Sequence, residues 1–199
     1  MYKVLASSIS GNCYKVKLLL EQLQTPYQWE EMDVLKGATK TPEFLKINPN
    51  GQVPALEIKP GQYLSESNAI LCYLADGTSF WSAERFQRAE TSQWLFFEQN
   101  SHLPFIAGAR FISKFLPADH PRRAELSHLH ERGYQALAVM EQRLARQSFF
   151  VGSTYSIADI ALFAYTHTVA DGGFELTRFP AISAWIERVK AQPKFVAMA

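Results

Sequence analysis

Two short stretches, 48–56 and 64–68, carry residue types suited to holding a small zwitterionic peptide. The first reads Asn-Pro-Asn-Gly-Gln-Val-Pro-Ala-Leu and predicts a turn into a short strand, because proline presets φ while Asn and Gly accept positive φ. Val53 precedes a proline, so extended geometry is favoured, with its N–H and C=O open to a bound peptide. The second reads Leu-Ser-Glu-Ser-Asn and opens a helix, where N–H groups attract a carboxylate and a neighbouring Glu can hold an amine.

The elements that must position these stretches alternate between strand and helix in the first half of the chain. Apolar residues at i, i+3, i+4 and i+7 from Val16 predict a helix after a first strand. Thr41-Pro42 has the form of a helix cap followed by proline at the first helical position. The expected strands are 2–6, 28–33, 55–58 and 63–64, with a polar loop at 34–41 and a helix from 67. This order predicts a small mixed sheet with helices packed on it.

Strand signals stop near 76–79, and the second half reads as helical. Residues 85–115 form one long helix or two, with Pro104 kinking or dividing it. Further helices are expected to start at 119–121 and 179–180. Ser156 and Asp159 have the spacing of a capping box, which bears on folding and carries no chemistry.

Composition limits the partners that the chain is expected to have. The 199 residues suffice for one large domain or two small ones, and a net charge of +1 argues against nucleic acid or an anionic membrane as the main partner. No apolar run approaches the ~20 residues that cross a bilayer. The apolar stretch at the amino terminus is too short, and polar residues follow too early, for a signal peptide. Two cysteines are too few for a disulfide framework. We therefore expect a cytoplasmic protein.

The Asn-Pro-Asn-Gly-x-Val-Pro-Ala-Leu turn, the Leu-Ser-Glu-Ser-x-Ala-Ile helix start and the order of the elements around them resemble the cytosolic glutathione transferase family. The resemblance implies a thioredoxin-like, glutathione-binding domain over residues 1–77 and an all-helical domain over 82–199 that bears a pocket for the electrophile. It also implies a cis bond between Val53 and Pro54. The Ser-Ile-Ala-Asp motif of the capping box is a further family feature.

The chemistry that the resemblance implies is activation of the glutathione thiol. A thiol with a pKa near 8.5 is only about 3% thiolate at pH 7, and the thiolate is the nucleophile. The family places a Tyr, Ser or Cys between its first strand and first helix, and Ser10 best occupies that position, which points to a bacterial serine-type, theta-, nu- or beta-related branch. The alternative for Ser10 is a plain helix cap. Asn12 either donates a second hydrogen bond or holds the turn, and Cys13 is a competing nucleophile or a small buried hydrophobe.

The resemblance also assigns the peptide-binding residues. Gln52 is expected near the glutamyl or glycyl end, the Val53 backbone beside the cysteinyl part, and Pro54 completes the turn. Glu66 is expected to hold the α-amino group and Ser67 the γ-glutamyl carboxylate, with a plain helix cap as the alternative for both and a solvated loop side chain as the alternative for Gln52. Two weaker candidates for the glycyl carboxylate follow: Thr39 and Lys40.

For the electrophile, five side chains of the helical domain are candidates to line an apolar pocket, with core packing of the aromatics as the alternative: Phe105, Ile106, Arg110, Phe111 and Phe163. The five histidines show no metal-ligand spacing, so no metal is expected. The resemblance implies a homodimer in which a residue near Asn100 reaches the partner's glutathione.

The sequence thus predicts a detoxifying glutathione transferase that conjugates the glutathione thiolate to small hydrophobic electrophiles. Two alternatives stay open: a glutathione-dependent peroxidase or disulfide reductase on the same scaffold, and a non-catalytic binding module. The identity of the electrophile does not follow from the sequence.

Overall fold

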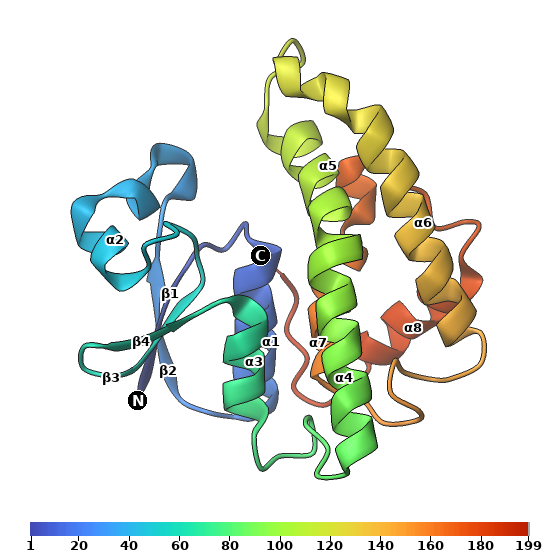
Figure 1. Ribbon diagram of the computed structural model, residues 1–199, viewed down its shortest axis with the longest axis horizontal. Helices are drawn as coiled ribbons and strands as arrows, with labels where there is room; N and C mark the ends of the chain where they lie inside the picture. Colours follow the sequence, from blue (N-terminus) through green and yellow to red (C-terminus); the bar gives the residue numbers. More distant parts are fainter. Residues whose placement is uncertain (199) are drawn as a thin grey trace. The chain divides into compact units, whose positions relative to one another are not determined.

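A four-stranded sheet forms the centre of the N-terminal unit in this computed structural model, which describes residues 1–198 (Figure 1). The strand order is β2-β1-β3-β4; β1 runs parallel to β2, and β3 runs antiparallel to both β1 and β4. The strands are β1 (Tyr2–Ala6), β2 (Tyr27–Glu31), β3 (Ala55–Lys59) and β4 (Gln62–Ser65).

Helices cover both faces of this sheet. α1 (Gly11–Gln22) and α3 (Ser67–Ala75) pack against each other on one face, and α2 (Pro42–Ile47) lies on the other (Figure 1). Because side chains alternate along a strand, Leu5 and Ala55 face α2, where they form a small core with Phe44. The predicted thioredoxin-like fold is therefore confirmed. The expected polar loop contains two 3₁₀ turns, η1 (Val34–Lys36) and η2 (Ala38–Lys40).

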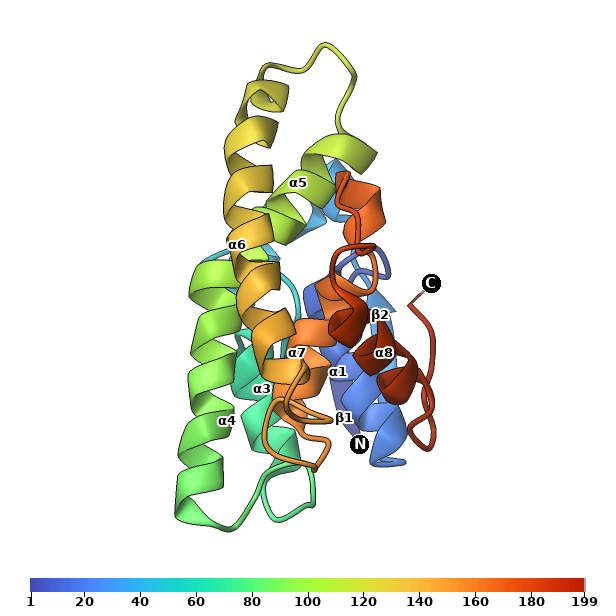
Figure 2. The same cartoon turned by 90° about the vertical axis from the view of Figure 1, so that its right-hand side faces the viewer.

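The second unit is helical, and Figure 2 shows its helices from a second side. The predicted break near Pro104 is confirmed: α4 and α5 are separated by a π-helical turn, η3, and Pro104 lies in the first turn of α5. The elements in order are α4 (Arg85–Phe97), η3 (Glu98–His102), α5 (Leu103–Phe115), η4 (Pro121–Glu125), α6 (Leu126–Leu144), α7 (Ile157–Thr166), η5 (Val169–Gly172) and α8 (Pro180–Lys190).

α7 forms the core of the helical unit, since all ten of its residues are buried. The predicted capping box is present at its start. The Asp159 carboxylate accepts hydrogen bonds from the Ser156 N–H at 3.0 Å, the Phe150 N–H at 3.1 Å and the Trp185 indole at 2.9 Å. A buried carboxylate needs such donors, and these tie the helix start to α8 and to the preceding loop.

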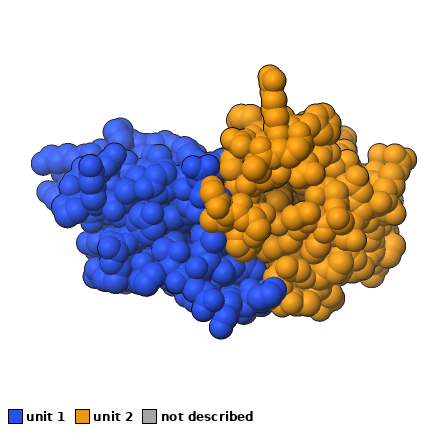
Figure 3. All heavy atoms as spheres, turned by 90° about the horizontal axis from the view of Figure 1, so that it is seen from below, with its two compact units in different colours: residues 1–76, 193–199 blue, residues 77–192 orange. Residues whose placement is uncertain are grey.

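The division of the chain differs from the predicted ranges at the C-terminus. One unit comprises residues 1–76 with 193–198, and the other comprises residues 77–192 (Figure 3). The expected helical domain, 82–199, thus included a segment that belongs with the first unit. This segment is held by the buried Tyr14, whose hydroxyl donates to the Val196 C=O at 2.7 Å.

The turn that leads into β3 is organised by Asn48. This buried side chain donates to the Gln52 C=O at 2.8 Å and accepts from the Asn50 N–H at 3.1 Å, while its backbone C=O accepts from the Gly51 N–H at 2.8 Å. Gly51 adopts a φ of +62°, and the Val53–Pro54 bond is cis, as the family resemblance implied. The turn residues that the sequence singled out therefore have a definite conformation fixed by one side chain.

Substitution of Gly51 tests how closely this turn is packed. A Cβ at position 51 would lie 2.7 Å from the Lys40 Nζ and 2.9 Å from the Thr39 C=O, whereas a Cβ at Gly61, which also has a positive φ, would meet nothing within 4 Å. We expect Gly61→Ala to cost about 1–2 kcal/mol for the left-handed backbone. Gly51→Ala should cost at least about 1 kcal/mol more, because the neighbouring backbone must also move. Urea denaturation measures both, and equal losses would contradict the close packing.

Candidate functional site

The register of the sheet brings three predicted segments together at the same end of the strands: the loop at 7–13, the turn at 48–54 and the helix start at 65–68. Leu5 pairs with Ala55, and Ala55 pairs with Ser65. The loop after β1, the turn before β3 and the helix start after β4 therefore follow directly from three neighbouring strand ends. Sequence motifs at 7–13, 48–54 and 65–68 thus form one continuous candidate site in the N-terminal unit.

Ser10 caps α1 through its hydroxyl oxygen. Its Oγ accepts the Cys13 N–H at 3.4 Å, and its own N–H donates to the Ser7 C=O at 3.0 Å. A hydroxyl has one donor and two acceptor positions, so accepting from the helix leaves the O–H free to donate. The capping interpretation and the thiol-donor interpretation of Ser10 are therefore compatible.

The loop that carries Ser10 is tied to the end of β2 by Glu31. Its carboxylate accepts from the Ser8 N–H at 2.8 Å, the Ser8 hydroxyl at 2.7 Å, the Ser7 hydroxyl at 3.4 Å and the Trp29 indole at 2.7 Å. Burial raises the pKa of Glu31, but the hydrogen bonds from Trp29 and Ser8 outweigh it, so the pKa lies below its usual range. The carboxylate that fixes the loop is therefore ionised at neutral pH. Glu31 could not be identified from the sequence, because nothing in a glutamate at a strand end indicates which loop it contacts.

Cys13 is enclosed in the protein and is a poor nucleophile. Its side chain is fully buried, and its sulfur accepts the Ser7 N–H at 3.3 Å. Burial raises the pKa of the Cys13 thiol to about 11, although hydrogen bonds with Ser10 and Ser7 favour the thiolate. The structure thus favours the interpretation of Cys13 as a small buried hydrophobe. Cys72 lies in an apolar run of the sequence but is only partly buried on α3.

Asn12 contacts the start of α3. Its side-chain oxygen accepts the Ser67 hydroxyl at 3.3 Å. The same Ser67 oxygen accepts from the Lys15 ammonium at 3.3 Å, and Lys15 also donates to the Asn68 oxygen at 3.4 Å. Lys15 was missed, although one signal was available: it lies four residues before Leu19, on the apolar stripe of α1.

The turn presents the backbone of Val53 and the side chain of Gln52. Among residues 1–198, no hydrogen bond of the turns and loops uses the Val53 N–H or C=O. The Val53 side chain packs on the small core, and the Gln52 side chain is exposed. Pro54 is buried behind them. The arrangement leaves a peptide-like backbone segment available for pairing with a ligand.

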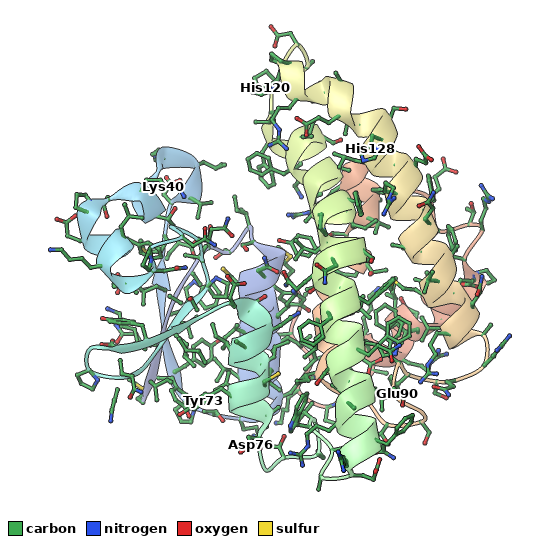
Figure 4. The ribbon with its side chains drawn as sticks, in the orientation of Figure 1. Lys40, Tyr73, Asp76, Glu90, His120 and His128 are labelled. Carbon is green, nitrogen blue, oxygen red and sulfur yellow. The ribbon has the colours of Figure 1, made fainter. Side chains whose placement is uncertain are left out.

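Thr39 and Lys40 support this turn. Thr39 is 5% exposed, so it offers little surface to a ligand. Lys40 lies beside α2 (Figure 4), and its ammonium donates to the Gly51 C=O at 2.8 Å and to the Asn50 C=O at 3.4 Å. Lys40 therefore holds the turn by hydrogen bonds and keeps a charged group beside it.

Glu66 has an exposed side chain that makes no capping hydrogen bond to α3. The plain-cap interpretation of this residue is therefore excluded. Its backbone has φ 69° and ψ 111°, a conformation that side-chain-bearing residues rarely adopt and that costs about 1–3 kcal/mol. Such strain concentrates at functional sites, where the surrounding structure holds it in place.

The residues considered for an electrophile pocket do not form one set in the helical unit. Ile106 and Phe163 are completely buried, and Arg110 is 6% exposed with its guanidinium 3.0 Å from the Asp171 carboxylate. Phe105 lies in ring contact with His128 and beneath the Arg132 guanidinium, and Phe111 is partly exposed. For Ile106 and Phe163, the core-packing alternative is the correct one.

Neither a metal site nor a membrane-spanning helix is found in the described part of the chain. No cluster of three or more His, Cys, Asp or Glu side chains among residues 1–198 could hold a metal ion. Figure 4 labels His120, which precedes η4, and His128, which lies in α6. Within the same residues, no helix combines the length and hydropathy that crossing a bilayer requires.

Comparisons with known proteins agree across both units. Residues 5–76 match the family model for the glutathione S-transferase N-terminal domain, and residues 103–193 match that for the C-terminal domain. A glutathione S-transferase structure from Pseudomonas fluorescens has 53% identity and a TM-score of 0.96, covering 99% of this chain and 98% of that one. The Escherichia coli disulfide-bond oxidoreductase YfcG is 34% identical over 190 residues, 92% of this chain and 87% of YfcG. The glutathione transferase URE2P6 from Phanerochaete chrysosporium, solved with oxidized glutathione, has 27% identity and a TM-score of 0.86, covering 97% and 92%.

Removing the Glu31 carboxylate should free the loop that carries Ser10. In the wild-type protein, four hydrogen-bond donors share the two carboxylate oxygens of Glu31. The amide of Glu31→Gln offers only one acceptor oxygen, so we expect faster hydrogen exchange at residues 7–10. Glu30→Gln is the matched control, because the neighbouring Glu30 carboxylate pairs with Lys3 on β1. In wild-type protein the protection is expected above the ordinary carboxyl pKa and should disappear as pH falls through the lowered pKa of Glu31. Unchanged exchange in Glu31→Gln would contradict the anchoring role.

Substitution at Glu66 should separate the backbone strain from the side chain. Glu66→Gly removes a strain of about 1–3 kcal/mol, at the cost of about 0.5–1 kcal/mol of chain entropy. We therefore expect a net gain in unfolding free energy of about 1 kcal/mol. Glu66→Ala keeps the strained backbone and should show no gain. Chemical denaturation distinguishes the two, and equal stabilities would show that the positive φ is not strained.

Proposed function

Because this chain belongs to the glutathione S-transferase family, we propose that it binds glutathione along the edge formed by the β1, β3 and β4 ends and transfers its thiolate to small hydrophobic electrophiles. Family members of known structure bind glutathione, as the complex of URE2P6 with its oxidized form illustrates. The observation that carries the proposal is the convergence of Ser10, Val53 and Ser67 on one edge of the sheet.

Each end of glutathione finds a chemically suited partner in this proposal. The free N–H and C=O of Val53 pair with the cysteinyl backbone, and the exposed Glu66 carboxylate binds the α-amino group. The start of α3 at Ser67 receives the γ-glutamyl carboxylate. Gln52 lies at the rim of the turn, and Lys40, with Thr39 beneath it, supplies positive charge towards the glycyl carboxylate.

Ser10 would stabilise the thiolate of bound glutathione. Lowering a thiol pKa by one to two units requires roughly 1.4–2.8 kcal/mol of preference for the anion. One hydrogen bond from a hydroxyl to a charged acceptor contributes about 1.5–3 kcal/mol. The Cys13 N–H that donates to the Ser10 oxygen polarises the hydroxyl and strengthens this donation. The thiolate then attacks an electrophilic carbon, a C–S bond forms, and the leaving group departs with its electron pair.

A second candidate function, disulfide reduction, is favoured by the relationship to YfcG, which is a disulfide-bond oxidoreductase. In that reaction one glutathione thiolate attacks a disulfide and expels a thiolate, and a second glutathione attacks the mixed disulfide. Two glutathione molecules are oxidised to glutathione disulfide, and the substrate is reduced to two thiols. The buried Cys13, with its raised pKa, is unsuited to this role, so both thiols would come from glutathione.

The Ser10→Ala variant tests the assignment of the thiol donor. We expect the pKa of the bound glutathione thiol, followed by its ultraviolet absorbance, to rise by one to two units, because a charge-assisted hydrogen bond is lost. Ser183→Ala is a suitable control, since its hydroxyl donates to the Phe179 C=O at the start of α8 and takes no part in the loop that carries Ser10. An unchanged titration midpoint in Ser10→Ala would show that Ser10 acts only as a helix cap.

Paired assays distinguish the candidate functions. Conjugation is measured with a chloronitrobenzene, and reduction with a peroxide and with 2-hydroxyethyl disulfide. Reduction without conjugation would overturn our first choice, and absence of glutathione binding at millimolar concentration in calorimetry would favour a non-catalytic module.

We also expect a homodimer, which sedimentation measures, and a cytoplasmic location. Assignment to the serine-type branch stays a prediction. Asn100, the residue expected near the partner, is exposed in η3.

A further inference from the structure

A short segment that follows the last helix, residues 195–198, lies beside the residues that precede and follow Ser10. The segment belongs to the first unit, and three of its residues are partly buried: Phe195, Val196 and Met198. The chain turns at Lys194, which adopts a φ of +58°. A residue with a side chain is seldom found in that conformation unless the surrounding contacts hold it there. The segment therefore has a defined place in the first unit, although it follows the helical unit in the chain.

Tyr14 holds this segment from the first turn of α1. Its hydroxyl donates to the Val196 C=O at 2.7 Å, and its backbone N–H donates to the Ser10 C=O at 2.9 Å. Tyr14 is 2% exposed, and burial raises the pKa of its hydroxyl, so the hydroxyl stays protonated and acts as a donor at neutral pH. One residue therefore bonds both Ser10 and the segment 195–198.

Met198 lies beside the loop that precedes Ser10. It lines a small pocket together with residues of that loop, α1 and β2: Ser8, Tyr14, Lys17 and Trp29. Ser8 and Trp29 both donate to the Glu31 carboxylate, which anchors the loop. A methionine side chain fills irregular gaps and packs favourably against aromatic rings. Met198 is therefore placed next to the anchored part of the loop.

We propose that residues 195–198, held by Tyr14, position the Ser10 hydroxyl for the thiol of glutathione, an inference that rests on the proposed function. The segment meets the protein at Ser8, two residues before Ser10, and at Tyr14, four residues after it, so it restrains both sides of the turn. A hydrogen bond weakens steeply as its geometry departs from linear, so a small displacement of Ser10 weakens its donation to the thiolate. Tyr14 and Met198 act through Ser10 and do not contact the ligand.

The test follows the pKa of the bound glutathione thiol by its ultraviolet absorbance. Tyr14→Phe removes only the hydroxyl that bonds the Val196 C=O, and Met198→Ala removes the side chain that lies beside Ser8. We expect each variant to raise the thiol pKa by about half a unit, which is about a threefold loss of thiolate at a pH below that pKa. This shift is smaller than the one expected for Ser10→Ala, which removes the donor itself.

A double substitution distinguishes positioning from a purely structural role. Because Tyr14 acts through Ser10, adding Tyr14→Phe to Ser10→Ala should not change the thiol pKa further, since no hydroxyl is left to be positioned. A purely structural role would give the same shift with and without Ser10. Tyr27→Phe is the matched control: it removes a tyrosine hydroxyl that donates to Glu21 of α1 at 2.7 Å, and it should keep the wild-type pKa.

The outcomes separate the two proposals. If Ser10→Ala raises the thiol pKa but folded Tyr14→Phe leaves it unchanged, the role of the segment is overturned and the proposed function stands. An equal shift from Tyr14→Phe with and without Ser10 would also overturn that role. Should Tyr14→Phe fail to fold, Met198→Ala decides alone: a raised pKa supports the positioning role, and an unchanged pKa overturns it. If the wild-type protein binds no glutathione, the proposed function fails, and the inference about the segment fails with it.

Discussion

The pairing of β3 between β1 and β4 is the constraint on which the candidate site depends. Ala55 pairs with Leu5 on one side and with Ser65 on the other, so three segments leave the sheet at the same edge. A shift of one residue in either register would exchange the two faces of β3, burying polar groups and exposing Leu56. The buried side chains on both faces therefore fix the register, and the register fixes which loops meet. Binding groups from residues 7–13, 48–54 and 65–68 are neighbours for this reason.

The loops themselves are held by hydrogen bonds from polar side chains, most of which lie outside the predicted peptide-binding groups. Glu31 binds the loop before α1, Asn48 and Lys40 bind the turn before β3, and Lys15 with Asn12 binds the start of α3. Each of them replaces water at backbone or hydroxyl groups that would otherwise need it. The site is thus preorganised before any ligand arrives, and this lowers the entropy lost on binding. The exposed groups Glu66 and Gln52 are left to contact the ligand.

Burial also explains why the Cys13 thiol is a poor nucleophile in this protein. Cys13 lies in the first turn of α1, where a helix N-terminus lowers a thiol pKa in other settings, yet burial raises the pKa of this thiol to about 11. Desolvation therefore outweighs the favourable hydrogen bonds. A neighbouring hydroxyl, partly exposed on Ser10, keeps a proton available where a ligand thiol could reach it. The reactive sulfur is accordingly expected from the ligand, which suits both conjugation and glutathione-dependent reduction.

Many features of this structure depend on residues that are neighbours in the chain, and the sequence by itself sufficed to predict those features. The alternation of strands and helices, the cap at Thr41, the break near Pro104 and the capping box at Ser156 depend on neighbouring residues only, and the structure agrees with each. The family could be identified for the same reason, since its motifs are short and contiguous. The tertiary structure decided what depends on distant residues: the attachment of 193–198 to the first unit, the burial of Ile106 and Phe163, the anchoring of Ser8 by Glu31 and the meeting of Lys15 with Ser67. Those contacts join residues far apart in the chain, and only packing determines which distant side chains come together.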